Sequence, residues 1–158
     1  MSKRRQVRER VLQALYAEEL SGDDGEHVIE TLIRPIFGEE KGYMRFAEKL
    51  FLKSLDVRDE ADELIARHIQ NWELNRLALT DRLVLRMAIA EFLHFEDIPP
   101  KVTLNEALDV AKAFSTPKSG AFVNGVLDAV LGELQTNNRL KKSGRGLVGM
   151  PVSSPSDG

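Results

Sequence analysis

Basic residues crowd the start of the chain, where they could bind an anion. They are Lys3, Arg4, Arg5, Arg8 and Arg10. Helical spacing puts Arg4 and Arg8 in line with an apolar stripe, so the start of this helix must extend beyond the core. Cations at a helix N-terminus oppose the macrodipole, and an anionic ligand would relieve that repulsion. We predict that Arg4, Arg5 and Arg8 bind RNA; the alternative is a solvated, frayed terminus.

A second candidate anion site lies at residues 116–122. Thr116 and Pro117 predict an N-cap followed by proline at the first helical position. Lys118 and Ser119 would then add an ammonium and a hydroxyl to the free N–H groups of the helix start. Phe122 falls at the margin of the apolar stripe, where it could stack on an unpaired base. We predict RNA contacts at Lys118, Ser119 and Phe122, with an ordinary cap and a core phenylalanine as the alternative.

No residue pattern favours catalysis, a metal or a cofactor. Glu91 lies on a mostly apolar helix, and we interpret it as half of a structural ion pair with Arg86 or an arginine of another helix. The three histidines share no ligand spacing. A glycine motif at residues 144–149 matches the dinucleotide-binding pattern by chance, because neither a strand nor a helix is predicted around it. We therefore expect no enzyme.

The composition excludes several classes of protein. The 158 residues contain no cysteine, which excludes disulfide frameworks and thiolate sites and fits a reducing cytoplasm. We expect no membrane span and no secretory signal. The formal net charge is -3, but residues 1–16 carry +4, residues 139–158 carry +3 and residues 17–138 carry -10. Basic ends on an acidic body indicate contact with nucleic acid.

Apolar residues recur with helical spacing along nearly the whole chain, which predicts an all-α fold of about seven helices. One helix is expected over residues 26–37, and a long stretch over residues 43–72 is expected to break at Asp56. Thr80 should cap a buried central helix, and Thr103 with Glu106 should form a capping box that opens the next helix. We divide the chain into helical subdomains 1–74 and 75–137 and a disordered basic tail, 138–158.

Four motifs follow one another in order along residues 2–136. They are Arg4-Arg5-x-x-Arg8-Glu9 with Leu12-Gln13-Ala14-Leu15-Tyr16; Asp81-x-x-x-Leu85-Arg86-x-Ala88-x-x-Glu91-x-Leu93; Ile98-Pro99-x-Lys101-Val102-x-x-Asn105-Glu106-Ala107; and Ala111-Lys112-x-Phe114 with Phe122-Val123-Asn124-Gly125-Val126-Leu127-Asp128. Each motif alone is weakly specific, but the four motifs together, in this order and spacing, are strongly specific. Over this range the chain resembles the NusB family of bacterial transcription antitermination factors.

The resemblance implies a function and its partners. Such a factor binds the boxA element of nascent ribosomal RNA leaders jointly with NusE, a small-subunit ribosomal protein, and joins RNA polymerase with other Nus factors. The family's RNA contacts match Arg4, Arg5, Arg8 and Phe122.

The surface that faces NusE in the family includes positions that match Tyr16 and Asp81. This chain has Lys118 where a well-known relative has an acid, which should strengthen phosphate attraction. It also has Asp81 where a longer glutamate is typical. Apolar faces of this kind can self-associate, so a homodimer is left open.

Two other functions could use a helical domain of this kind. Some ribosomal RNA cytosine methyltransferases begin with a similar helical domain, but they need a cysteine nucleophile and a large cofactor domain. This chain has no cysteine, which argues against methyl transfer. The remaining alternative is a helical protein–protein adaptor without specific RNA binding.

Overall fold

The computed structural model describes residues 2–69, 74–114 and 116–150, and these form helices without any strand. The predicted all-α class is therefore confirmed. The α-helices are α1 (Lys3–Ser21), α2 (Gly25–Val28), α3 (Arg34–Phe37), α4 (Lys41–Asp56), α5 (Arg58–Ala66), α6 (Leu79–His94), α7 (Pro100–Phe114) and α8 (Pro117–Thr136). None of the described helices combines the length and the apolar character that a membrane crossing requires.

Helix α1 is bounded by residues suited to its ends. The hydroxyl of Ser2 accepts a hydrogen bond from the Arg5 N–H at 3.1 Å, which satisfies one of the free donors of the first turn. Gly22 ends the helix at φ +70°, a left-handed conformation that favours glycine, and its N–H donates to the Glu18 carbonyl. Between these ends, Val7, Val11 and the following apolar positions are buried.

The segment predicted as one helix over residues 26–37 is divided into three parts. A π-helical turn, Ile29–Ile33, separates α2 from α3. Its apolar residues Ile29 and Ile33 are both buried, so the wider turn still directs them into the core. Pro35 lies in the first turn of α3. The predicted end before Gly38 is confirmed, as is the break near Asp56 between α4 and α5.

Helix α6 is the buried central helix that its apolar residues predict. It packs against α1, α4, α5, α7 and α8, and almost every residue from Leu83 to Phe92 is buried. The predicted cap was wrong, because the helix begins at Leu79 after Ala78 and Thr80 lies inside its first turn. Asp81 does lie in the first turn, where a carboxylate favours the macrodipole.

The capping box predicted at Thr103 and Glu106 was also wrong. Helix α7 begins at Pro100, which already has the backbone angle of a first helical residue. Both side chains therefore lie inside the helix and make tertiary contacts, described below. At α8 the predicted boundary is confirmed: Thr116 is the N-cap and Pro117 follows it.

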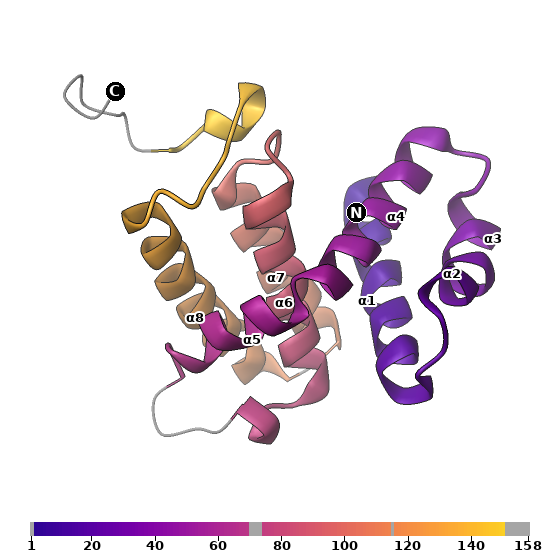
Figure 1. The fold of residues 1–158 in the computed structure, drawn as a ribbon, viewed down its shortest axis with the longest axis horizontal. Coiled ribbons are helices and arrows are strands. Elements are labelled where there is room, and N and C mark those ends of the chain that lie inside the picture. The colour runs from indigo at the N-terminus through magenta and orange to yellow at the C-terminus, as the bar shows by residue number, and fades with distance from the viewer. Residues whose placement is uncertain (1, 70–73, 115, 151–158) are drawn as a thin grey trace.

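The N-terminal helices α1–α4 lie on one side of the molecule and α7 and α8 on the other, with α6 between them (Figure 1). The core is continuous across the two groups, because α6 contributes to both. The proposed subdomain boundary at residue 74 coincides with a short 3-10 turn, Leu74–Arg76.

The sequence predicts a disordered tail over residues 138–158, but residues 139–150 contact the rest of the protein, and we call them the C-terminal strap. The strap includes a 3-10 turn, Gly144–Leu147. The Ser143 N–H donates to the Glu96 carbonyl at 2.9 Å, and Gly146 is buried against that same carbonyl. A Cβ on Gly146 would lie 1.8 Å from the carbonyl oxygen, so only glycine fits here. Residues 151–158 of the predicted tail lie outside the described residues.

Candidate nucleic-acid interface

The arginines at the start of α1 differ in how far they are available to a ligand. Arg4 is exposed, and its guanidinium lies 4.5 Å from the centroid of the Phe46 ring. Among the described residues it makes no ion pair or hydrogen bond through its side chain. The neighbouring Lys3 pairs with Glu40 at 3.2 Å. Arg4 thus matches the prediction of a cation presented to solvent.

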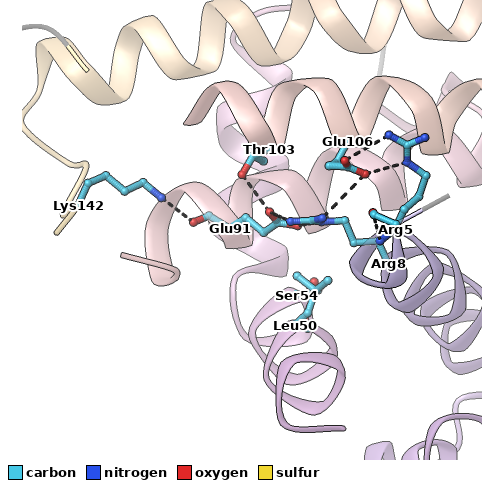
Figure 2. A network of polar contacts seen from close by, with 9 residues as sticks. Arg5, Arg8, Leu50, Ser54, Glu91, Thr103, Glu106 and Lys142 are labelled. Atoms are coloured by element: carbon cyan, nitrogen blue, oxygen red, sulfur yellow. Dashed lines mark hydrogen bonds and ion pairs between the residues drawn. The ribbon is translucent and has the colours of Figure 1, made fainter. Parts of the chain in front are cut away.

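Arg8, by contrast, is buried inside the protein. Its side chain is 3% exposed, and it donates to both oxygens of Glu91, at 2.7 and 2.9 Å (Figure 2). The Thr103 hydroxyl donates to Glu91 from α7 at 2.9 Å. Burial alone would lower the pKa of Arg8, but attraction and hydrogen bonding to Glu91 outweigh it and the pKa is raised.

The interpretation of Glu91 as a structural ion pair is confirmed, with the partner on α1 rather than in Arg86. Arg86 instead pairs with Asp62 of α5. The prediction that Arg8 contacts RNA does not fit its burial. Arg8 fixes α1 against α6 and α7, and so holds the neighbouring arginines in place.

Arg5 lies between these extremes. Its side chain is 29% exposed and binds two acids of α7. Glu106 accepts hydrogen bonds from Nε at 2.9 Å and Nη2 at 3.2 Å, and Asp109 forms an ion pair with Nη2 at 2.7 Å. The hydrogen bond to Glu106 is the largest cause of the raised pKa of Arg5.

A hollow of about 280 Å³ lies at the start of α8. Its walls are Arg76, Leu77, Ala78, Asp81, Thr116, Lys118, Ser119 and Phe122. Phe122 is half-buried and packs its inner side on the core, and Lys118 is exposed. An aromatic wall beside an exposed ammonium suits an unpaired base with its phosphate, as the sequence predicts for these two residues.

Ser119 faces inward rather than toward an anion. Its hydroxyl donates to Oδ2 of Asp81 at 3.1 Å, and its N–H donates to the Thr116 carbonyl. Both Ser119 and Asp81 are buried. Direct RNA contact by Ser119 does not fit this arrangement; the residue joins the start of α8 to the start of α6. Oδ1 of Asp81 is buried and has no hydrogen-bond partner among the described residues.

The two residues predicted to face a partner protein lie in different environments. Tyr16 is 41% exposed on α1, and Leu20, one turn later, is 66% exposed. They form an apolar pair on one face of the helix. Asp81 is only 8% exposed and lines the hollow described above. The structure therefore exposes Tyr16 to solvent and buries Asp81.

The strap reaches the same network from the other end of α6. Lys142 donates from Nζ to the carbonyl of Glu91 at 3.1 Å (Figure 2). It also donates to the carbonyl of Phe95 at 2.8 Å. Each carbonyl also accepts a backbone N–H, Glu91 from Phe95 and Phe95 from Ile98, so Lys142 adds a charged donor at the C-terminal end of α6, where a cation favours the macrodipole. Burial lowers the pKa of Lys142 to about 8.

Sequence reasoning missed Glu106, Asp109 and Lys142. Glu106 was assigned to a local cap, although a capping box and a tertiary ion pair use the same residue type. Asp109 carries a usable signal, since it lies three residues after Glu106 and therefore on the same helix face. The contacts of Lys142 could not be found, because nothing in a basic, glycine-rich segment indicates where it docks.

The described residues include no group of three or more histidines and acids that could hold a metal. His68 pairs with Glu133 at 2.8 Å. Hydrogen bonds from Arg67 and His68 lower the pKa of Glu133 to about 2, against the opposing effect of burial. His68 and Glu133 thus form a surface pair that links α8 to the residues following α5.

Comparison with known proteins gives a consistent result. The profile of the NusB family matches residues 5–132. The transcription antitermination protein NusB of Salinibacter ruber is 49% identical over 150 residues, covering 95% of this chain and 94% of that protein. The same protein of Chloroherpeton thalassium is 43% identical, covering 94% and 71%.

Solved structures agree with these sequence relatives. T. maritima NusB superposes with a TM-score of 0.76 at 36% identity, covering 84% of this chain and 92% of that one. A chain from a structure described as antitermination factors NusB and NusE in complex with dsRNA has a TM-score of 0.74 at 25% identity, covering 82% and 96%. The family profile spans Arg5, Arg8 and the α8 hollow, with Arg4 immediately before it, and the chain belongs to the NusB family.

Proposed function

We propose that the chain is a transcription antitermination factor that binds boxA RNA of nascent ribosomal leaders jointly with NusE. The pair would then join RNA polymerase and other Nus factors in the cytoplasm. The observation that carries this proposal is the half-buried Phe122 beside exposed Lys118, at a hollow large enough for a base. This function requires binding alone and no chemical step, cofactor or metal.

The RNA-binding surface extends from α1 to α8 in this proposal. Arg4 and Lys118 contact phosphates, and Phe122 stacks on an unpaired base. Arg5 contributes a phosphate contact through the part of its guanidinium that is not bound to Glu106 and Asp109 of α7. Arg8 and Ser119 position these groups from within the protein, because both are buried and bonded to carboxylates.

The partner surface is centred on Tyr16 and Leu20. Two exposed apolar side chains one turn apart on α1 suit the apolar face of another protein. Asp81 acts indirectly, by holding the start of α8 through Ser119.

The test is a comparison of boxA RNA with a scrambled RNA, measured by fluorescence anisotropy with and without NusE. We expect weak binding by the chain alone, tighter binding with NusE, and affinity that decreases as salt increases. Equal affinity for the two RNAs in the presence of NusE would contradict the proposal and favour the adaptor function. Light scattering on the same samples determines whether the chain self-associates and so covers this surface.

Variants at the hollow test the assignment of residues. Phe122→Ala should weaken boxA binding by about 1–3 kcal/mol through loss of stacking. Ile36→Ala is the matched control, because it removes an exposed apolar side chain of α3 that belongs to neither the RNA surface nor the partner surface. A folded Phe122→Ala protein that binds RNA normally would remove Phe122 from the site.

A further inference from the structure

Asp109 occupies part of the surface through which Arg5 would hold a phosphate. A guanidinium binds an anion through its Nε–Nη2 edge or through its Nη1–Nη2 end. Glu106 already accepts from Nε and Nη2, which leaves the end of the group as the route for a ligand. Oδ2 of Asp109 lies 2.7 Å from Nη2, one of the two nitrogens at that end.

The two acids have different roles. The Glu106 side chain is 16% exposed and also lies 3.9 Å from Nη1 of Arg8, so it belongs to the packed network. The Asp109 side chain is 39% exposed and can turn toward solvent without leaving a buried charge unpaired. Glu106 therefore fixes Arg5, while Asp109 is the group that a phosphate can displace.

The charges at Arg5 favour this exchange. Arg5 is bound by two carboxylates, Glu106 and Asp109, so these three groups together carry a net charge of -1. A phosphate that approaches Arg5 meets this negative charge unless Asp109 moves away.

We propose that Asp109 is an intramolecular competitor for phosphate at Arg5 and limits how tightly the α1 surface holds RNA. This inference rests on the proposed RNA-binding function. Because a phosphate has the same charge in every sequence, Asp109 weakens binding to boxA and to other RNA alike. Its presence would reduce occupation of the chain by RNA that lacks boxA.

The exchange predicts a distinct salt dependence. Binding of single-stranded RNA weakens with salt by a slope of about 0.7 for each phosphate neutralised. In the wild type, Arg5 neutralises a phosphate only by releasing Asp109, so the total charge that Arg5 neutralises does not change. In Asp109→Asn the contact is not offset, so the slope should become steeper by up to about 0.7.

The experiment measures binding of boxA and scrambled RNA to the full chain with NusE, at several salt concentrations. Asp109→Asn should bind both RNAs about two- to fivefold more tightly, the range expected for an exposed ion pair. Asp23→Asn is the control, since it makes the same charge change beyond the far end of α1, which extends about 24 Å from Arg5 to Ser21. In an Arg5→Ala background, Asp109→Asn should give no gain.

The outcomes separate this inference from the proposed function. Equal gains in Asp109→Asn and Asp23→Asn, an unchanged affinity and slope, or a gain that persists without Arg5 would overturn the competitor role. A wild type with no preference for boxA would overturn the proposed function, while the gain on both RNAs would still support the role of Asp109. Absence of binding to either RNA would overturn both.

Discussion

The starts of α1 and α8 are both candidate RNA contacts, yet they handle charge in opposite ways. At α1, Arg5 and Arg8 are bound by carboxylates from α6 and α7, whereas the exposed Arg4 has no acidic partner among the described residues. At α8, Lys118 is exposed above a buried carboxylate, Asp81, that is bound by Ser119. The number of cations in a segment therefore overstates the charge it offers to a ligand.

The difference also separates stability from binding. The α1 cations contribute to the fold because their partners lie on two other helices, whereas Phe122 and Lys118 line an open hollow. Substitutions that break the α1 ion pairs should therefore change the free energy of unfolding, whereas substitutions of Phe122 and Lys118 should change the affinity for RNA.

The largest expected effect is at Glu91. Glu91→Gln leaves Arg8 buried without its carboxylate and should lower the free energy of unfolding by about 3–5 kcal/mol. Urea denaturation monitored by circular dichroism measures this. The control is Glu30→Gln, which removes an exposed pair with Arg34. If Glu91→Gln lost no more than that control, the α1 network would not be structural.

A smaller loss is expected at the start of α8. Ser119→Ala removes the hydroxyl that donates to Asp81 and should cost about 1–3 kcal/mol of unfolding free energy, because that carboxylate is buried. The same urea measurement allows direct comparison with Glu91→Gln. If Ser119→Ala lowered the free energy of unfolding as much as Glu91→Gln, the starts of α1 and α8 would not differ in their contribution to stability.

The strap should respond to pH through Lys142. The pKa of this residue is about 8 in the folded chain, against an ordinary value of 10.5 when unfolded. Between these values the unfolded state binds more protons, so the contribution of Lys142 to stability should rise with pH from about 8 to 10.5 and stay flat below. The measurement is the difference in unfolding free energy between wild type and Lys142→Met at each pH, and a difference that falls over this range would contradict the assignment.

The smallest effect is expected for the exposed ion pair between Glu30 and Arg34. Glu30→Gln should leave the free energy of unfolding close to that of the wild type, because solvent and salt screen an exposed ion pair. Denaturation at low and high salt checks this, and a loss comparable with that of Ser119→Ala would show that exposure does not explain the contrast with Glu91.

Local patterns predicted the helices better than the site. Apolar spacing identified α1, α4 and α8, because each buries a face that repeats every three or four residues, and apolar residues all round identified α6 as the central helix. The starts of α6 and α7 were misplaced, since Thr80 and Thr103 resemble caps in sequence but lie inside their helices. The pairing of Glu91 with an arginine of another helix was expected in kind, yet its identity depends on contacts between residues 83 positions apart.

That separation has a consequence for synthesis of the chain. Helix α1 leaves the ribosome before α6, and the carboxylate that neutralises its buried Arg8 lies 83 residues later. At about 5–20 residues per second, Glu91 follows Arg8 by roughly 4–17 s. During this interval α1 cannot pack in its final position without burying an unpaired charge. The N-terminal half of the nascent chain must therefore wait for α6 before its arginines take their final places.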